Sequence, residues 1–264
     1  MRKYLARVSS WLGFMALLLC SSGMVMAQAK NEMLLYCGIT MVRPMAEIAQ
    51  VFEKREKTRI TIAQGGSEDL YQSAKKSGLG DWYLPGEPSY RDKHQPEGLL
   101  GDYVVVGYNQ LAMVVQKGNP KQIKPNPNEL LRKNLVSVIG NAESGSVGKE
   151  TKDVLDQVKI YPQVIKSAGF LVPDSRSLMA AMRNGEADIA LSWRATGFFP
   201  ENAEKLDVLD LDPKLAKPQA LMLIQLKSTK NAELGKRFMA FVAGEEGQSI
   251  FRKHGFLDNK LLVK

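Results

Sequence analysis

Apolar strand patterns alternate with amphipathic helix patterns along almost the whole chain. Seven segments are typical of strands, and several lack the polar alternation of a sheet with one face in water: MLLYC, RITIAQ, YVVVGYN, LAMVVQ, LVSVIG, DIALSW and LMLIQL. Between them, apolar residues recur at helical spacing over residues 43–57, 175–187 and 231–255. The alternation predicts an α/β fold in which mainly parallel strands are covered by helices.

The first residues have the three parts of a secretory signal peptide. Arg2 and Lys3 precede the apolar core LGFMALLLCSSGMVM, and VMAQA supplies small residues for cleavage, so residues 1–27 are predicted to be removed. The apolar core is shorter than the roughly 20 residues of a membrane-spanning helix. We therefore expect a soluble protein in the periplasm. Lipid anchoring at Cys20 is the less favoured alternative, because Leu19 stands where lipoprotein signals have a small residue.

Charge and reactive side chains exclude several function classes. The net charge of +8 at pH 7 comes from Lys and Arg that are spread along the chain, so nucleic-acid binding is not predicted, although a positive field favours a small anion. Cys37 is the one cysteine after the leader, which precludes an intramolecular disulfide. His94 and His254 lack the spacing of metal ligands or of a catalytic constellation. We predict no metal, no cofactor and no enzymatic activity.

Four strand-to-helix turns are rich in glycine and in hydroxyl side chains. The first contains Thr40, the second contains Ser67, the third spans residues 140–148, and the fourth contains Asp174 and Ser175. A helix N-terminus presents unpaired amide groups and a partial positive charge, which together attract an anion. A single turn of this kind is ordinary helix capping. Four of them in one exported chain predict that the helices converge on a bound anion.

Two segments carry a resemblance to a known family. LLYCGITMVRPMAEIAQVFEK, followed by ITIAQGGSEDLYQSAKK, resembles the opening of the periplasmic molybdate-binding proteins, and FMAFVAGEEGQSIFRKHGF resembles their final helix. The resemblance implies the two-lobed periplasmic-binding-protein fold, with the ligand between two α/β lobes that crossing strands join. It implies that lobe I comprises residues 28–110 and about 229–264, and that lobe II comprises residues 111–228.

The resemblance also implies which residues bind the ligand. The family's two hydroxyl ligands fall on Thr40 and Ser67. Its two backbone-amide positions fall on Val147 and Ser175, where the donor is independent of the side chain. These four residues are the expected core of the site.

Four further residues are expected near the ligand on weaker grounds. The family's tyrosine falls on Trp193, an indole donor of different reach, next to Arg194. Arg43 adds a cation near the mouth of the site, where a guanidinium suits a tetrahedral oxyanion. Cys37 is a small buried residue in one interpretation and a ligand for a thiophilic solute in the other.

The resulting functional hypothesis is capture of a small, molybdate-like oxyanion by a monomer that delivers it to an inner-membrane ABC permease. The alternative is a sensory protein that presents its solute to a receptor or a histidine kinase without transport. Molybdate, tungstate, sulfate and phosphate all remain open as the ligand, because the replacement of tyrosine by Trp193 departs from the family pattern.

Overall fold

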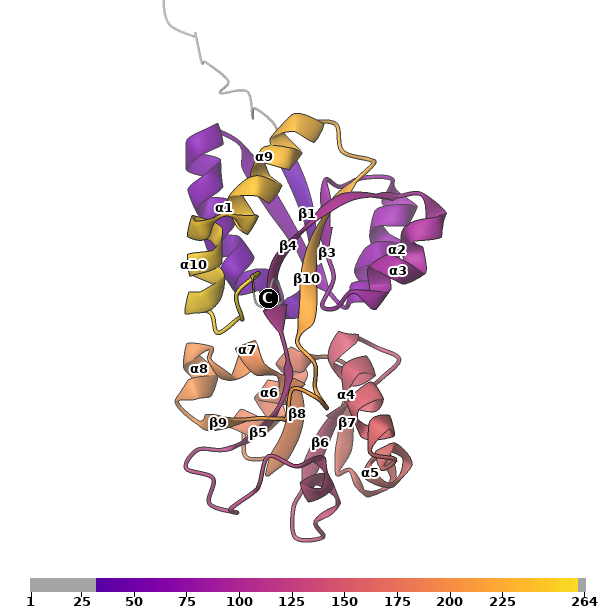
Figure 1. Ribbon diagram of the computed structural model, residues 1–264, viewed down its shortest axis with the longest axis vertical. Helices are drawn as coiled ribbons and strands as arrows, with labels where there is room; N and C mark the ends of the chain where they lie inside the picture. Colours follow the sequence, from indigo (N-terminus) through magenta and orange to yellow (C-terminus); the bar gives the residue numbers. More distant parts are fainter. Residues whose placement is uncertain (1–31, 261–264) are drawn as a thin grey trace, which may run out of the picture.

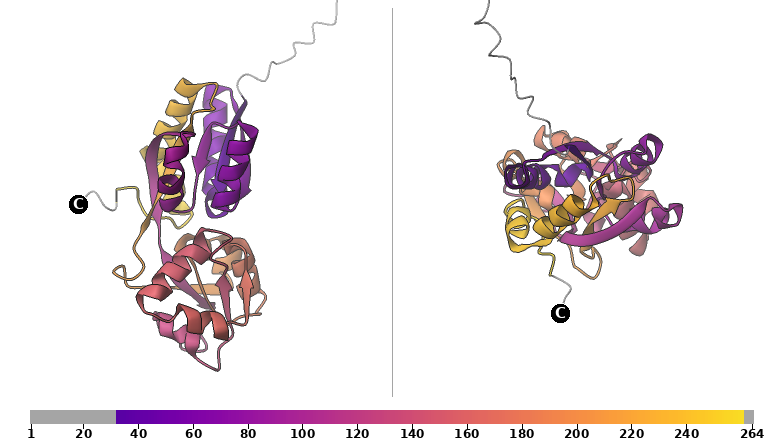
Figure 2. Two further views of the ribbon diagram at one scale, coloured as in Figure 1. Left: turned by 90° about the vertical axis from the view of Figure 1, so that its right-hand side faces the viewer. Right: turned by 90° about the horizontal axis from the view of Figure 1, so that it is seen from above.

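The computed structural model describes residues 32–260 and divides them into two lobes. Each lobe is built on a five-stranded sheet, and the lobes lie one above the other (Figure 1). The same separation is visible when the molecule is turned by 90° (Figure 2). The predicted two-lobed α/β architecture is confirmed. The expected signal peptide, residues 1–27, and Cys20 within it lie outside the described residues.

The sheet of lobe I has the order β2-β1-β3-β10-β4. Its strands are β1 (Glu32–Gly38), β2 (Arg59–Gly65), β3 (Trp82–Leu84), β4 (Leu100–Asn109) and β10 (Gln219–Leu226). β1 is parallel to β2 and β3, whereas β10 is antiparallel to β3 and β4. Because β1, β2 and β3 are parallel, their carboxyl ends meet at one edge of the sheet, and this edge faces lobe II (Figure 1).

Helices cover both faces of this sheet. They are α1 (Val42–Glu56), α2 (Ser67–Ser77), α3 (Ser89–His94), α9 (Ala232–Ala243) and α10 (Glu245–Lys253), with 3-10 turns η1 (Ile39–Met41) and η2 (Gln95–Glu97). Successive side chains of β1 point to opposite faces, as strand geometry requires. Leu35 packs with α1, α9 and α10 in one core cluster, and Tyr36 packs with α2 in another.

Lobe II repeats the plan with the sheet order β7-β6-β8-β5-β9. Its strands are β5 (Leu111–Gln116), β6 (Ser137–Gly140), β7 (Phe170–Val172), β8 (Ile189–Trp193) and β9 (Leu206–Asp210). Its helices are α4 (Ser146–Gln157), α5 (Tyr161–Ser167), α6 (Ser175–Arg183), α7 (Arg194–Gly197) and α8 (Pro200–Ala203), with 3-10 turn η3 (Pro127–Leu131). β6 is parallel to β7 and β8, and β5 is antiparallel to β8 and β9. In both sheets the strands on one side are thus parallel to each other, whereas the strand that follows a crossing, β5 or β10, is antiparallel to both of its neighbours.

The chain crosses between the lobes twice. The outgoing crossing lies at Gln110, between β4 and β5, and the return lies between β9 and β10. The Gln110 side-chain amide donates to the carbonyl of Leu211 at 3.1 Å, so the two crossings are tied to each other. The expected boundary near residue 229 places β10 in lobe II. Its pairing with β3 and β4 instead places it in lobe I, because the chain has already crossed back before Gln219.

The C-terminal helical pattern, expected to be continuous over residues 231–255, is two helices. α9 ends and α10 begins at Gly244, which has an extended backbone with φ −76° and ψ 171°. The amides of Gly244 and Gln248 bond to the carbonyls of Ala240 and Gly244, which completes both helix ends. Glu245 and Glu246 then occupy the first turn of α10, where acidic residues favour a helix start.

Candidate functional site

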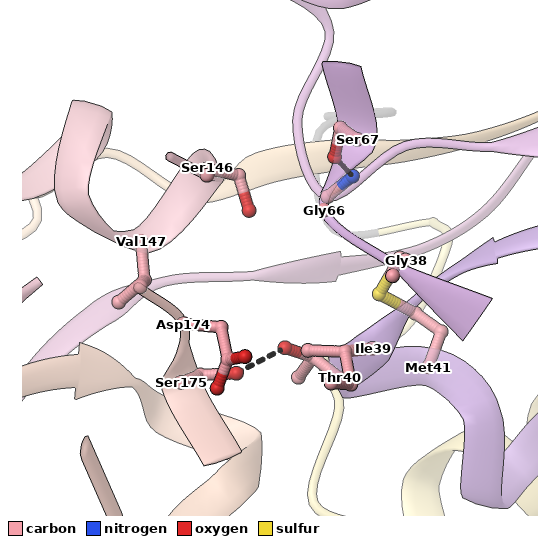
Figure 3. Close-up of a pocket in the computed structure, with 13 residues that line it drawn as sticks. Gly38, Ile39, Thr40, Met41, Gly66, Ser67, Ser146, Val147, Asp174 and Ser175 are labelled. Atoms are coloured by element: carbon pink, nitrogen blue, oxygen red, sulfur yellow. Dashed lines mark hydrogen bonds between the residues drawn. The ribbon is translucent and has the colours of Figure 1, made fainter. Parts of the chain in front are cut away.

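The four strand-to-helix turns meet at one small cavity between the lobes. The cavity has a volume of about 20 Å³ and is lined by Gly38, Ile39, Thr40, Met41, Gly65, Gly66, Ser67, Gly86, Gly145, Ser146, Val147, Asp174 and Ser175. We call it the inner cavity. Figure 3 shows the contributions of both lobes, with Ser67 and Thr40 from lobe I and with Ser146 and Ser175 from lobe II. Each of the four turns predicted from the sequence supplies lining residues.

Helix starts surround the inner cavity. α2 begins after Gly66, α4 begins after Gly145 and α6 begins after Asp174, and all three of these preceding residues have extended backbones. η1 begins after Gly38 and leads into α1. The first amides of a helix have no partner within the helix. Their partial positive charge is therefore concentrated around the inner cavity.

Hydroxyl groups complete the set of hydrogen-bond donors. The hydroxyls of Thr40 and Ser175 are 3.1 Å apart and join the two lobes (Figure 3). The Ser67 hydroxyl oxygen accepts the amide of Gly86 at 3.0 Å, which leaves its own proton for another acceptor. Thr40, Ser67, Val147 and Ser175 all line the inner cavity where the sequence placed them.

Trp193 lies behind the inner cavity rather than in its wall. Its side chain is buried, and its indole N–H donates to the hydroxyl oxygen of Ser146 at 3.2 Å. Ser146 lines the inner cavity, so Trp193 orients a lining hydroxyl instead of facing a ligand directly. The sequence named Ser146 only as part of a glycine-rich turn. The signal that could have singled it out is its place as the first residue of α4.

Arg194 also lies outside the inner cavity. Its guanidinium pairs with the Asp210 carboxylate at 2.9 Å, donates to the carbonyl of Gly255 at 3.2 Å and stacks over Phe198. These contacts hold the Arg194 guanidinium against β9 and against Gly255. The expectation that Arg194 binds the ligand is therefore corrected, because Arg194 does not line the inner cavity and its guanidinium is held by Asp210 and Gly255.

The one charged side chain that lines the inner cavity within residues 32–260 is Asp174. One of its carboxylate oxygens accepts the amide of Ser177 at 2.8 Å and caps α6, as its sequence position suggested. Sequence reasoning treated Asp174 as a cap and missed its position in the site. The hydrogen-bond donors of the inner cavity are neutral hydroxyls and backbone amides.

Polar contacts join the lobes on both sides of the inner cavity. Beside the Thr40–Ser175 contact, the Arg176 guanidinium donates to the side-chain oxygen of Gln64 at 2.8 Å. Two ion pairs also cross between the lobes, Arg43 with Glu201 and Lys149 with Glu87. The structure therefore represents the closed arrangement, in which a ligand would touch both lobes.

Cys37 belongs to the core of lobe I. It is fully buried among apolar residues of β1, α1 and β10, and its thiol lines neither the inner cavity nor a neighbouring one. Burial raises the pKa of the Cys37 thiol far above its usual range, so the thiolate is strongly disfavoured. This placement favours the interpretation of Cys37 as a small buried residue over that of a ligand.

Cys37→Ser is expected to lower the free energy of unfolding by about 1–3 kcal/mol, because it places a hydroxyl in an apolar setting. Affinity for molybdate should stay unchanged. Urea unfolding and calorimetric titration of the two proteins measure both quantities. Loss of arsenite binding in the variant alone would show instead that the thiol is a ligand.

Residues 32–260 contain no helix with both the length and the apolar character needed to cross a membrane. The same residues contain no group of three or more His, Cys, Asp or Glu side chains arranged to hold a metal ion. His94 bonds to Glu68 and Glu97, and His254 bonds to Glu47.

The two lobes, the paired crossings and the cavity between the lobes at the helix starts are typical of a two-lobed solute-binding protein. The sequence agrees, because the family model for bacterial extracellular solute-binding proteins matches residues 33–257. The chain belongs to that family.

The chain is similar to several known proteins at low sequence identity. A Haemophilus influenzae protein named as a binding protein is 21% identical over 229 residues, which are 87% of this chain and 92% of that protein. A Bacillus subtilis protein named as the ABC transporter substrate-binding lipoprotein YvgL is 22% identical over 195 residues, which are 74% and 69% of the two chains. The periplasmic molybdate-binding protein of Azotobacter vinelandii has a TM-score of 0.73 at 15% identity and covers 85% of this chain and 98% of its own. Sulfate-, iron- and thiamin-binding proteins also share the fold, so the fold does not select the ligand.

Proposed function

We propose that this protein captures a small tetrahedral oxyanion of the molybdate kind in the periplasm and delivers it, as a monomer, to an inner-membrane ABC permease. The observation that carries the proposal is the meeting of four helix starts, two from each lobe, at one cavity with neutral hydrogen-bond donors. The names of the Bacillus subtilis and Azotobacter vinelandii relatives support an ABC importer and an oxyanion, respectively. We propose no catalytic step, since the site offers only hydrogen-bond donors and one capping carboxylate.

Ligand binding would stabilise the closed arrangement because the donors come from both lobes. An oxyanion in the inner cavity would accept hydrogen bonds from Thr40 and Ser67 in lobe I and from the amides of Val147 and Ser175 in lobe II. The hydroxyls of Thr40 and Ser175, now bonded to each other, would each turn to a ligand oxygen. A ligand that touched one lobe only would not shift the equilibrium between open and closed forms.

Asp174 makes phosphate a necessary member of any ligand panel. Hydrogen phosphate carries a proton, for which Asp174 supplies the one carboxylate among the described residues that line the inner cavity. Fully ionised molybdate or sulfate would instead be repelled by the charge of that carboxylate. Tighter binding of phosphate than of molybdate would therefore indicate that the Asp174 carboxylate accepts the proton of the ligand. The reverse order would indicate that it does not.

A thermal-shift panel of molybdate, tungstate, sulfate, phosphate and arsenite tests the proposal. A ligand present at 100 times its dissociation constant stabilises the protein by about 2.7 kcal/mol, which is a readily measured increase in Tm. We expect at least one tetrahedral oxyanion to raise Tm. Neutral organic solutes are added as a second panel. If one of them raises Tm and no anion does, an oxyanion site is rejected.

Ser67→Ala is expected to weaken oxyanion binding by about 1.5–3 kcal/mol, because it removes one hydroxyl donor to a charged ligand. The free energy of unfolding should fall by about 1–3 kcal/mol, because the buried amide of Gly86 loses its acceptor. Ser73→Ala is a matched control on the exposed side of the same helix, where the hydroxyl bonds to the carbonyl of Asp69. Calorimetric titration with the best oxyanion of the panel should separate the two variants. Equal affinities would show that Ser67 does not face the ligand.

A further inference from the structure

A second, larger cavity adjoins the inner cavity. It has a volume of about 250 Å³ and shares Ile39, Thr40 and Ser175 with the inner cavity. We call it the outer cavity. The bonded hydroxyls of Thr40 and Ser175 lie where the two cavities meet, so a ligand that parts these hydroxyls would connect them.

Three arginines line the outer cavity, whereas Glu201 is its one carboxylate within the described part of the chain. Arg43 pairs with Glu201 and stacks over the ring of Phe199. Arg176 donates to the side-chain oxygen of Gln64, and Arg183 donates to that of Asn202. Both acceptors are neutral amides, so the charges of Arg176 and Arg183 are not neutralised by a carboxylate bonded to them within residues 32–260.

The outer cavity differs chemically from the inner one. Its guanidinium groups present planar pairs of donors that match a carboxylate, while the inner cavity presents single hydroxyls and amides. Arg176 and Arg183 are seven residues apart on α6, which places them on the same side of the helix. α6 also begins at the inner cavity, so one helix serves both cavities.

We infer that the ligand's oxyanion head carries a short organic substituent with a carboxylate, which occupies the outer cavity beside Arg176 and Arg183. This inference rests on the proposed function, because it needs an oxyanion in the inner cavity. A free oxyanion would leave the outer cavity and its two cations to solvent. A small acid with a phosphate, phosphonate or sulfonate head would fill both cavities and contact the two lobes over a larger surface.

Pairs of probes that differ only in the carboxylate test the inference by calorimetry. Phosphoglycolate is compared with ethyl phosphate, and sulfoacetate is compared with ethanesulfonate, with molybdate as the unsubstituted oxyanion. In at least one pair we expect the carboxylated member to bind about tenfold tighter or more. Arg183→Gln should reduce that ratio while leaving the affinity of the carboxylate-free member nearly unchanged, because its bond to Asn202 lies within lobe II. Arg176→Gln should reduce the ratio as well. Arg237→Gln is the control for net charge, because Arg237 pairs with Glu56 on the far side of lobe I.

The outcomes separate this inference from the proposed function. If molybdate binds but neither pair shows a preference for the carboxylate, the inference is wrong and the oxyanion site stands. A preference that survives both arginine substitutions also overturns it. If none of the four probes and none of the tetrahedral oxyanions molybdate, tungstate, sulfate and phosphate binds, the proposed function fails as well.

Discussion

Gly86→Ala is expected to weaken oxyanion binding by about 3 kcal/mol, or roughly 100-fold, by holding the two lobes apart. Gly86 belongs to lobe I and follows β3, and it faces Ser146 at the start of α4 in lobe II. A Cβ atom at Gly86 would lie 2.2 Å from the hydroxyl oxygen of Ser146 and 2.9 Å from its Cβ. Ser146 has little freedom to move away, because the indole of Trp193 holds its hydroxyl.

The effect should appear in binding and not in the folding of either lobe. The backbone of Gly86 is not in the left-handed region, so alanine adds no local strain, and it lowers the entropy of the unfolded chain. We therefore expect an unchanged or slightly raised Tm without ligand. Gly65→Ala is the matched control, since its added Cβ would meet only Leu70 of the same lobe, at 3.6 Å.

Calorimetric titration with the best oxyanion of the panel and small-angle X-ray scattering measure the two consequences. Ligand should reduce the radius of gyration of the wild type and of Gly65→Ala, and should reduce it less for Gly86→Ala. Wild-type affinity together with full closure in Gly86→Ala would show that Ser146 yields and that this contact does not limit closure.

The position of the inner cavity could be predicted because it follows from the direction in which neighbouring strands run. Strands that are parallel share the edge at which they end, and three of the four turns begin at the end of an apolar run that is followed by Gly. The backbone-amide positions Val147 and Ser175 were implied by the resemblance to the molybdate-binding proteins, and both lie at helix starts. Helix starts expose amides whatever the side chain, so the prediction did not depend on side-chain direction.

The residues that sequence reasoning misplaced depend on side-chain direction at the ends of elements. Trp193 and Arg194 are neighbours in the sequence, but one is buried behind Ser146 and the other pairs with Asp210 on β9. The short strands β3 and β7 have three residues each, too few for a period to be recognised. β10 was assigned to the wrong lobe because an apolar run does not reveal on which side of a crossing it pairs.

The spacing of the two arginines of the outer cavity is visible in the sequence, although it was not interpreted there as part of a site. Arg176 and Arg183 are spaced for one face of a helix that the sequence did predict. What the sequence could not show is that neither arginine bonds to a carboxylate within residues 32–260, since Arg176 bonds to Gln64 of the other lobe. Uncompensated charge is a property of the assembled structure, and it requires every neighbouring element to be in place.

Glu150→Gln is expected to stabilise the protein at alkaline pH and to leave its stability nearly unchanged in acid. Glu150 lies on α4 with 5% of its surface exposed, and its carboxylate accepts the side-chain amide of Gln219, the first residue of β10, at 3.1 and 3.2 Å. Burial raises the pKa of Glu150 to about 7, and the negative charges of Glu87 and Asp153 add to this, whereas the hydrogen bond from Gln219 and the charge of Lys149 oppose it.

The direction of the pH dependence follows from the raised pKa. Between pH 4.5, the ordinary value for a glutamate, and about pH 7, the folded protein retains a proton that the unfolded chain has released. This group therefore makes the folded state less stable as the pH rises through that window. The loss is complete above pH 7, where it is on the order of 3 kcal/mol, and Glu150→Gln should recover most of it. The glutamine side chain of the variant keeps a carbonyl oxygen that can accept the amide of Gln219.

Urea unfolding of the wild type and of Glu150→Gln at pH 4, 6 and 8 measures the difference directly. The difference should be small at pH 4, where the Glu150 carboxyl is mostly neutral in both the folded and the unfolded states, and largest at pH 8. Glu233→Gln, at a side chain that is 79% exposed, controls for the removal of one negative charge and should give a difference that varies little with pH. A pH-independent difference for Glu150→Gln would show that the carboxylate is ionised in the folded protein throughout. The crossing at Gln219 would then be held by a charged rather than a neutral acceptor.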